Sequence, residues 1–197
     1  MDKDGKTAIF CYGSNHPVQI SERLELELDY VLEHCVPCTL KGYKRAYEGV
    51  AHFWESKSAA TIVKDEASKI DAFAFYMTPE HVRMMDVFEG YPTFYERVPV
   101  DLMDRNGNHF TGEVYIMNPT GIFTYPSEKY LERCGLTFMA FHYLHHQPLP
   151  EEFDLYKTIF PVHNAITGEI AGEHCWEGHH LHEVITQYMR KPITVAE

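Results

Sequence analysis

Glu89 and the turn that begins at Gly13 are the two features of this chain best suited to chemistry. Glu89 stands at the end of a short predicted helix, directly before a glycine. Four aromatic residues are its sequence neighbours: Phe88, Tyr91, Phe94 and Tyr95. Aromatic neighbours remove water from a carboxyl group and favour its protonated form, a condition for exchanging protons near neutral pH. Acidic residues before glycine are also common at solvated helix ends, so a functional and a structural interpretation stay open.

The second feature is the turn in IFCYGSN, residues 9–15. The stretch begins with strand-forming residues and then breaks into Gly13, Ser14 and Asn15, which favour turns and expose backbone N–H groups. Glycine lets a ligand approach the backbone, and the amides that follow can point at it, so such a turn can bind an anion. An ordinary β-turn has the same composition, and the turn alone does not decide between the two.

The size and charge of the chain limit its class. Its 197 residues, 45% of them hydrophobic, can bury one sizeable core, so we expect one main domain with a terminal extension. The formal net charge of −12 argues against nucleic acid and against an anionic membrane surface as partners. No apolar run reaches the length of a membrane span, and the first residues do not resemble a secretion signal. The sequence therefore predicts a cytoplasmic protein without a membrane contact.

The cysteines favour reduced thiols over a disulfide framework. There are five of them: Cys11, Cys35, Cys38, Cys134 and Cys175. An odd number in a chain without a signal sequence makes a framework of disulfides improbable. Cys35 and Cys38 have the spacing of a redox motif or of half a zinc site, but a second such pair and the βαβ context are missing. We interpret them as a pair of small, partly buried residues.

Two helical stretches lie beside the turn and the glutamate. Apolar spacing in residues 20–35 predicts an amphipathic helix or two shorter pieces, with Ser21 as an N-cap candidate. In TPEHVRMMDVFEG, residues 78–90, the threonine suits the helix cap, the proline suits the first helical position, and the glycine ends the helix. The second helix would therefore deliver Glu89 at its last turn.

The remaining stretches have the patterns of strands. Residues 6–15 are predicted to be a strand followed by a loop, and residues 38–55 and 59–77 to be strand-rich segments split by polar turns. Residues 95–117 form two alternating runs around Asn106-Gly107, which is a strong hairpin signal. Helices and strands together predict an α+β fold.

Three motifs, in this order, resemble those of the γ-glutamylcyclotransferase superfamily. They are Tyr12-Gly13-Ser14-Asn15; Met85 to Gly90 with Pro92, Tyr95 and Arg97; and Pro126, Ser127, Tyr130, Leu131 and Gly135. The resemblance covers roughly residues 8–149, and three ordered motifs are more specific than any one of them.

This resemblance implies a fold and a reaction. It implies a small mixed β-barrel with surrounding helices in residues 1–150, followed by a C-terminal extension of unknown role in residues 151–197. Members of the superfamily cyclise a γ-glutamyl amide to 5-oxoproline and release an amine or amino acid. The reaction needs no cofactor and no metal. Glu89 would act first as general base on the α-amine and then as general acid on the leaving nitrogen.

The resemblance also implies a set of substrate-binding residues. They are Tyr12, Gly13, Ser14, Asn15, Tyr95, Ser127 and Tyr130. The backbone amides of the turn would hold either the α-carboxylate or the oxyanion on the γ-carbon. Two of the set have structural alternatives, since Tyr12 suits a half-buried strand end and Ser127 suits a helix N-cap. Arg97 is better explained as a paired strand arginine than as a substrate clamp.

The motifs do not agree on a substrate. Asn15 resembles relatives that act on γ-glutamyl amino acids, whereas glutathione-specific relatives usually carry leucine at this position. FEGYPTFYER, residues 88–97, is closer to relatives that act on γ-glutamylamines. A non-catalytic protein that binds a small ligand in the same pocket is the alternative function. The presence of Glu89 favours the enzyme, although a carboxylate can also bind a ligand's ammonium group.

The last part of the chain is rich in histidine. Potential metal ligands there are His163, His174, Cys175, His179, His180 and His182. Such residues can bind zinc, but the glycines between them argue against a rigid helix, and the implied reaction needs no metal. We therefore predict no metal site, and interpret the segment as a surface or as a contact between copies of the chain in a homo-oligomer.

Overall fold

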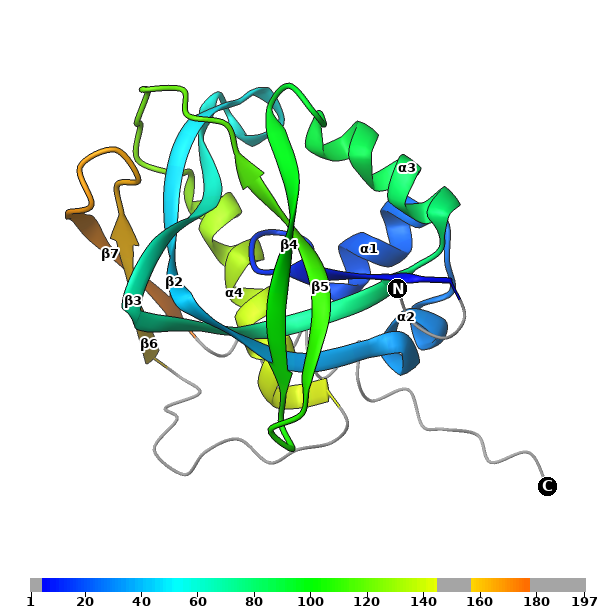
Figure 1. The fold of residues 1–197 in the computed structure, drawn as a ribbon. Coiled ribbons are helices and arrows are strands. Elements are labelled where there is room, and N and C mark those ends of the chain that lie inside the picture. The colour runs from blue at the N-terminus through cyan, green and yellow to red at the C-terminus, as the bar shows by residue number, and fades with distance from the viewer. Residues whose placement is uncertain (1–4, 145–156, 178–197) are drawn as a thin grey trace.

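The strands of this protein close into a barrel. A computed structural model describes residues 5–144 and 157–177 (Figure 1). The barrel strands are β1 Thr7–Cys11, β2 Cys35–Ala51, β3 Lys57–Met77, β4 Tyr95–Asp104 and β5 His109–Met117. Their order around the closed barrel is β1-β3-β2-β4-β5. The α+β class and the small barrel implied by the resemblance are confirmed.

Strand β1 closes the barrel and makes it mixed. It pairs antiparallel with β3, with Thr7 opposite Met77, and parallel with β5, with Ile9 opposite Glu113. From Ala8 onward β1 is buried on both of its faces, which explains why its sequence is a continuous apolar run. The loop that follows β1 thus starts from a strand that is hydrogen-bonded on both sides.

Strand β3 differs from the sequence prediction. The sequence suggested strand pieces split by polar turns, but residues 57–77 form one strand of 21 residues. Its polar middle does not turn because β2 continues beside it, from Cys35 opposite Phe75 to Ala51 opposite Lys57. An ion pair across the two strands, Lys44 Nζ to Asp65 Oδ2 at 3.4 Å, accompanies this pairing.

The helices are short and cover the barrel. They are α1 Pro17–Leu24, α2 Leu28–His34, α3 Pro79–Glu89 and α4 Glu128–Tyr143, with a 3₁₀ turn, η1, at His52–Trp54. Figure 1 shows α1, α2 and α3 grouped on one side of the barrel. The two-piece alternative for residues 20–35 is confirmed, because Glu25 adopts a left-handed conformation with φ 54° and ends α1.

The predicted helix caps are right in one case and wrong in another. In α3 the Thr78 side chain accepts a hydrogen bond from His81 N, and Gly90 ends the helix with φ 64°. Ser21 is not an N-cap, because α1 begins at Pro17 and is capped by His16. The Ser21 hydroxyl instead donates to Leu26 O at 2.6 Å and supports the turn after α1.

The core explains the cysteine pair. Cys35 and Cys38 are buried in β2, and neither is disulfide-bonded. Three positions apart in a strand, their side chains lie on opposite faces, so they cannot form a joint metal or redox site. Burial raises the pKa of both thiols, which keeps them protonated.

Part of the C-terminal extension packs on the barrel. Strands β6 Lys157–His163 and β7 Ile170–Glu177 form a hairpin on the side of the barrel opposite α3 (Figure 1). Val162 is buried, and Ala165 N donates to Tyr47 O at 3.1 Å. The rings of Phe138 and Phe160 meet edge to face at a centroid distance of 4.9 Å.

Several sequence predictions fall on residues that the structure does not describe. The predicted domain boundary near residue 150 and the histidines at 179, 180 and 182 lie outside the described residues. Within residues 5–144 and 157–177, no group of three or more metal-ligating side chains comes together. In the same residues no helix has the length and apolarity needed to cross a membrane.

Candidate active site

The turn predicted to bind an anion is the connection between β1 and α1. The strand ends at Cys11 and the helix begins at Pro17, so the loop contains Tyr12 to His16. His16 N donates to Ser14 O at 2.8 Å within the loop. From the first turn of α1, Gln19 Nε2 lies 3.3 Å from Ser14 Oγ and 3.4 Å from Asn15 Oδ1. The loop is therefore held from both ends.

The structure brings Glu89 to this loop. Glu89 is the last residue of α3, and its Oε1 accepts a hydrogen bond from Asn15 Nδ2 at 2.9 Å. Arg23 Nη1, from the last turn of α1, lies 3.2 Å from the same oxygen and 2.6 Å from Asn15 Oδ1. The other oxygen, Oε2, has no hydrogen-bond or ion-pair partner among the described residues. One oxygen is thus held by protein groups and the other is available.

The surroundings of Glu89 are more polar than the sequence suggested. Phe88 and Tyr91 are 50% and 41% exposed, so they do not enclose the carboxylate as we expected. The Phe88 ring instead stacks against the guanidinium of Arg23, with Arg23 Cζ 5.0 Å from the ring centroid. Because Phe88 and Glu89 are neighbours on a helix, their side chains leave it in different directions. The Glu89 side chain is only 13% exposed, and its immediate contacts are Asn15 and Arg23.

Arg23 is the residue at this site that the sequence reasoning missed. Its signal was its spacing, since Gln19 and Arg23 are four residues apart and share the face of α1 that looks back at the loop. Without the position of α3, this spacing did not point to Glu89.

Three tyrosines of the predicted binding set meet at the backbone of Ala60 in β3. Tyr95 Oη donates to Ala60 O at 2.7 Å, and Ala60 N donates to Tyr130 Oη at 2.8 Å. Tyr12 Oη donates to Tyr115 O at 2.7 Å and lies 3.4 Å from Ala60 O. All three hydroxyls are buried and engaged with the backbone.

The negative charge of Glu89 affects two of these tyrosines, Tyr12 and Tyr95. Burial raises the pKa of Tyr12 and Tyr95 well above the usual value, and the negative charge of Glu89 raises both further. Their hydroxyls therefore stay protonated and act as hydrogen-bond donors.

Gly13 is required neither by an unusual backbone conformation nor by a lack of space for a side chain. It is absent from the residues with positive φ. A Cβ at this position would lie 3.4 Å from Ala60 Cβ and 3.6 Å from Tyr130 Oη. Trp54 of η1 packs on the other side of Tyr130, with ring centroids 4.8 Å apart. The loop thus runs directly over the place where the tyrosines meet Ala60.

Ser127 and Arg97 lie in the structural positions that the sequence offered for them, a helix N-cap and a paired strand arginine. Ser127 is the N-cap of α4, and its hydroxyl accepts from Tyr130 N at 3.3 Å. Arg97 is ion-paired to Asp86 at 3.2 Å and to Glu113 at 2.8 Å. Asp86 also accepts from Tyr115 Oη at 2.7 Å, so this network fastens α3 to the barrel. It fixes the helix that presents Glu89 one turn further on.

His16 completes the loop as a neutral side chain. Its Nε2 lies 3.0 Å from Arg133 Nη1 of α4, and its Nδ1 lies 3.4 Å from Gln19 N. Burial and, to a smaller extent, the positive charges of Arg133 and Arg23 together lower the pKa of His16 to about 3. An uncharged imidazole therefore connects the loop to α1 and α4 at neutral pH.

Sequence comparison identifies the family. A sequence profile described as gamma-glutamyl cyclotransferase, AIG2-like, matches residues 9–133, a range that contains the loop, Glu89 and Tyr130. The chain belongs to this family. The superfamily resemblance seen in the three motifs is thereby confirmed. Among curated proteins, none is similar enough in sequence to count as a match.

Solved structures show the same fold. A protein titled gamma-glutamyl cyclotransferase aligns with a TM-score of 0.56 and 15% sequence identity. The alignment covers 76% of the present chain and 92% of the other protein. An uncharacterised protein from Homo sapiens aligns at 0.54 and 15% identity, over 76% and 92%. YkqA from Bacillus subtilis aligns at 0.55 and 15% identity, over 74% of this chain and 56% of its own. At these identities the likeness establishes the fold alone.

Proposed function

We propose that this protein cyclises a γ-glutamyl amide to 5-oxoproline and releases an amine or amino acid, with Glu89 moving the protons. One observation carries the proposal. Asn15 and Arg23 hold Oε1 of Glu89 beside the glycine loop, while Oε2 has no partner among the described residues. A carboxylate fixed at one oxygen and free at the other is well placed to take a proton from a bound ligand.

The first step uses the free oxygen as a base. The α-ammonium group of the substrate gives a proton to Oε2 of Glu89, and the neutral amine attacks the γ-carbonyl carbon of the same molecule. This attack closes a five-membered ring and places negative charge on the carbonyl oxygen. Backbone amides from Gly13 to Asn15 are available to stabilise that oxyanion. Because both reacting groups belong to one bound molecule, the site mainly has to fold the substrate.

The second step returns the proton. Protonated Glu89 donates to the nitrogen of the leaving group, and the bond from carbon to that nitrogen breaks as the carbonyl forms again. The ring nitrogen then passes its remaining excess proton through Glu89 to the released amine, which leaves as an ammonium ion beside 5-oxoproline. Atoms and charges balance without an oxidant, a metal or a cofactor. We assign Tyr12, Tyr95 and Tyr130 to the wall of the site, where their rings face the ligand and their hydroxyls serve the backbone. Ser127 supports Tyr130 as the cap of α4.

A ligand-binding protein without turnover is the second candidate. The observation in its favour is the ion pair of Glu89 with Arg23 at 3.2 Å, because a carboxylate already matched to a cation is also suited to hold a charged ligand. The two candidates differ in what happens to a γ-glutamyl compound once it is bound, which an assay can distinguish.

The test is a release assay over a panel of compounds. Purified protein is incubated with γ-glutamyl amino acids, γ-glutamylamines and glutathione, and 5-oxoproline is measured by chromatography. Glu89→Gln keeps the hydrogen bonds at Oε1 and removes the proton acceptor, so release should fall by roughly 10²- to 10⁴-fold. Binding of 5-oxoproline should change far less.

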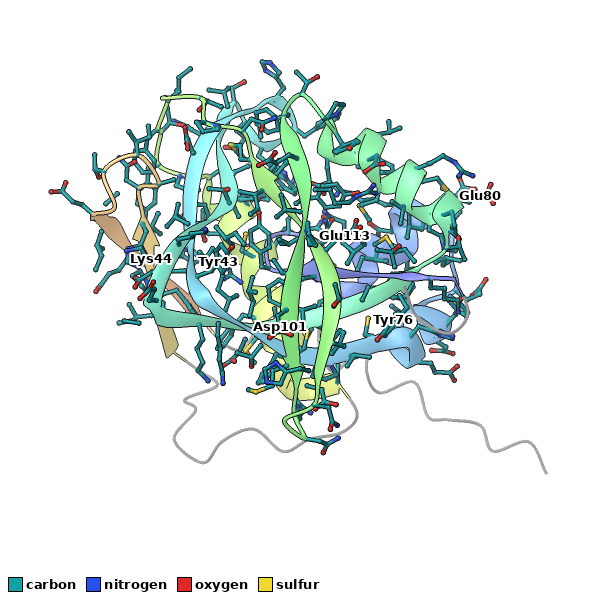
Figure 2. The ribbon with its side chains drawn as sticks, viewed as in Figure 1. Tyr43, Lys44, Tyr76, Glu80, Asp101 and Glu113 are labelled. Carbon is teal, nitrogen blue, oxygen red and sulfur yellow. The ribbon has the colours of Figure 1, made fainter. Side chains whose placement is uncertain are left out.

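A matched control is available on the other side of the barrel. Asp65→Asn also replaces an ion-paired carboxylate by an amide, in a pair with Lys44 at 3.4 Å. Figure 2 shows Lys44 and Glu80, which lies in the first turn of α3, on opposite sides of the view. This variant should keep the wild-type rate. If the wild type binds γ-glutamyl compounds but releases no 5-oxoproline from any of them, the binding function replaces the enzymatic one.

A further inference from the structure

We propose that Arg23 binds the α-carboxylate of the ligand while Glu89 binds the α-ammonium group. The inference deepens the proposed function and rests on it for the identity of the ligand. Its structural basis is the ion pair between the two side chains, which lie side by side at the loop with Nη1 and Oε1 3.2 Å apart.

The guanidinium of Arg23 has N–H donors that no protein group uses among the described residues. Its Nη1 is used by Asn15 Oδ1 at 2.6 Å and by Glu89 Oε1 at 3.2 Å. Neither Nε nor Nη2 has a hydrogen-bond or ion-pair partner in residues 5–144 and 157–177. The Arg23 side chain is 19% exposed, so it is not closed off from solvent. A guanidinium whose Nε and Nη2 are both free presents one edge with two N–H donors, which is suited to a carboxylate.

The orientation of the guanidinium is fixed before a ligand arrives. Asn15 holds it from the loop, Glu89 holds it from α3, and the ring of Phe88 lies against its face at 5.0 Å. Contacts on three sides reduce the side-chain entropy that is lost when the group binds a ligand. Arg23 is therefore prepared for recognition and does not need to reorganise.

The charges match the reacting end of a γ-glutamyl compound. Its α-carbon carries an ammonium group and a carboxylate, which are opposite charges on one atom. Oε2 of Glu89 is free for the ammonium, and Nε and Nη2 of Arg23 are free for the carboxylate. The ligand would thus place its two charges against the two opposite charges of the protein. Binding by this pair also puts the amine on the oxygen that must deprotonate it.

This assignment separates two roles that the sequence left joined. The backbone amides of residues 13–15 were candidates for holding either the α-carboxylate or the oxyanion. If Arg23 holds the α-carboxylate, those amides serve the oxyanion alone. A γ-amide without an α-carboxylate should then be recognised poorly even though it could still form a ring.

Three small probes test the assignment by calorimetry at neutral pH. L-Glutamine carries the γ-amide and both α-groups, glutaramate lacks the amine, and 4-aminobutanamide lacks the carboxylate. Arg23→Met removes the charge and keeps much of the side-chain length. Binding of L-glutamine and glutaramate should weaken by roughly 10- to 100-fold, the value of a hydrogen bond to a charged group. Binding of 4-aminobutanamide should not weaken.

Two further variants complete the test. Arg23→Lys returns a charge without the fork of donors and should restore part of the binding of L-glutamine. Glu89→Gln should weaken 4-aminobutanamide and leave glutaramate. A purely structural role of Arg23 would change all three probes together, so equal losses would overturn the assignment. Failure of L-glutamine and glutaramate to bind the wild type at millimolar concentration would also overturn it.

Turnover separates this inference from the proposed function. Each γ-glutamyl compound that the wild type converts is compared in turnover with the corresponding 4-aminobutanoyl amide, which lacks the α-carboxylate. Ring closure of that amide gives 2-pyrrolidinone instead of 5-oxoproline. Arg23→Met should raise KM for the first compound and leave the second unchanged. If the wild type converts nothing, yet glutaramate binding depends on Arg23, the proposed function fails and the carboxylate assignment stands.

Discussion

Replacing Tyr130 by phenylalanine tests whether the buried tyrosines support the site through the backbone of Ala60. The change removes only the hydroxyl that accepts from Ala60 N at 2.8 Å. Ala60 is 2% exposed, so water cannot take over this role without opening the core. A buried donor left without a partner costs about 1–3 kcal/mol. For a protein of this size, that corresponds to a lower Tm by roughly 2–12 °C.

Tyr95→Phe is the matched comparison. It removes a donor to the carbonyl of the same residue, Ala60, at 2.7 Å. That oxygen keeps the longer contact from Tyr12 at 3.4 Å, so less is left unsatisfied. The expected cost is about 0.5–1.5 kcal/mol, and the loss in Tm should be smaller than that of Tyr130→Phe. Because both hydroxyls act on Ala60, the effects of the double variant should not be additive.

Two measurements test this explanation of the Tyr130 hydroxyl. Circular dichroism follows the thermal unfolding of both variants, and 5-oxoproline release is measured at a temperature well below the Tm of either variant. The structural explanation requires that Tyr130→Phe be the less stable variant and that its folded form still turn over substrate. An unchanged Tm with abolished release would refute it, and would mean that the Tyr130 hydroxyl acts on the ligand.

Three further predictions concern other residues. Gly13→Ala should leave Tm nearly unchanged, because the new Cβ would lie in ordinary contact at 3.4 Å from Ala60 Cβ, while release falls roughly tenfold or more; a normal rate would contradict a role of the loop. His16 takes up a proton near pH 3 when folded but near pH 6.5 when unfolded, so stability decreases as the pH falls through this range. His16→Asn, which keeps a cap, should make that decrease shallower by at most about 1.4 kcal/mol per pH unit in urea unfolding, and parallel curves would contradict this. Gly112→Ala should cost about 1–3 kcal/mol in the same assay, because its Cβ would lie 2.9 Å from the backbone oxygen of Ala8 and 2.5 Å from Leu102 Cδ1. An unchanged midpoint would show that β1 and β5 can move apart.

Local signals made some elements predictable from the sequence. The cap at Thr78, the proline after it and the glycine at position 90 act within a few residues, and each has the predicted role in α3. The hairpin around Asn106-Gly107 is equally local, with Gly107 at φ 82°. Such features need no knowledge of the rest of the fold.

Other features depend on distant partners and could not be obtained in this way. The polar middle of β3 stays extended because β2 lies beside it, which no pattern within residues 59–77 reveals. Phe88 and Tyr91, two of the aromatic neighbours of Glu89 in the sequence, contact Arg23 and Arg97. The side chains that contact the Glu89 carboxylate come from residues 15 and 23. Family motifs identified the glutamate and the loop, but the arginine between them required the helix packing.

The parallel pairing of β1 with β5 has a consequence for how the protein is made. Tyr12 contacts Tyr115 across 103 positions of the chain, so β1 leaves the ribosome well before β5, the strand with which it pairs in parallel. Contacts of such high sequence separation slow folding, because the chain loses entropy before they form. The loop that follows β1 is therefore set late, and a nascent or truncated chain that ends before residue 109 leaves an apolar strand edge for chaperones to shield.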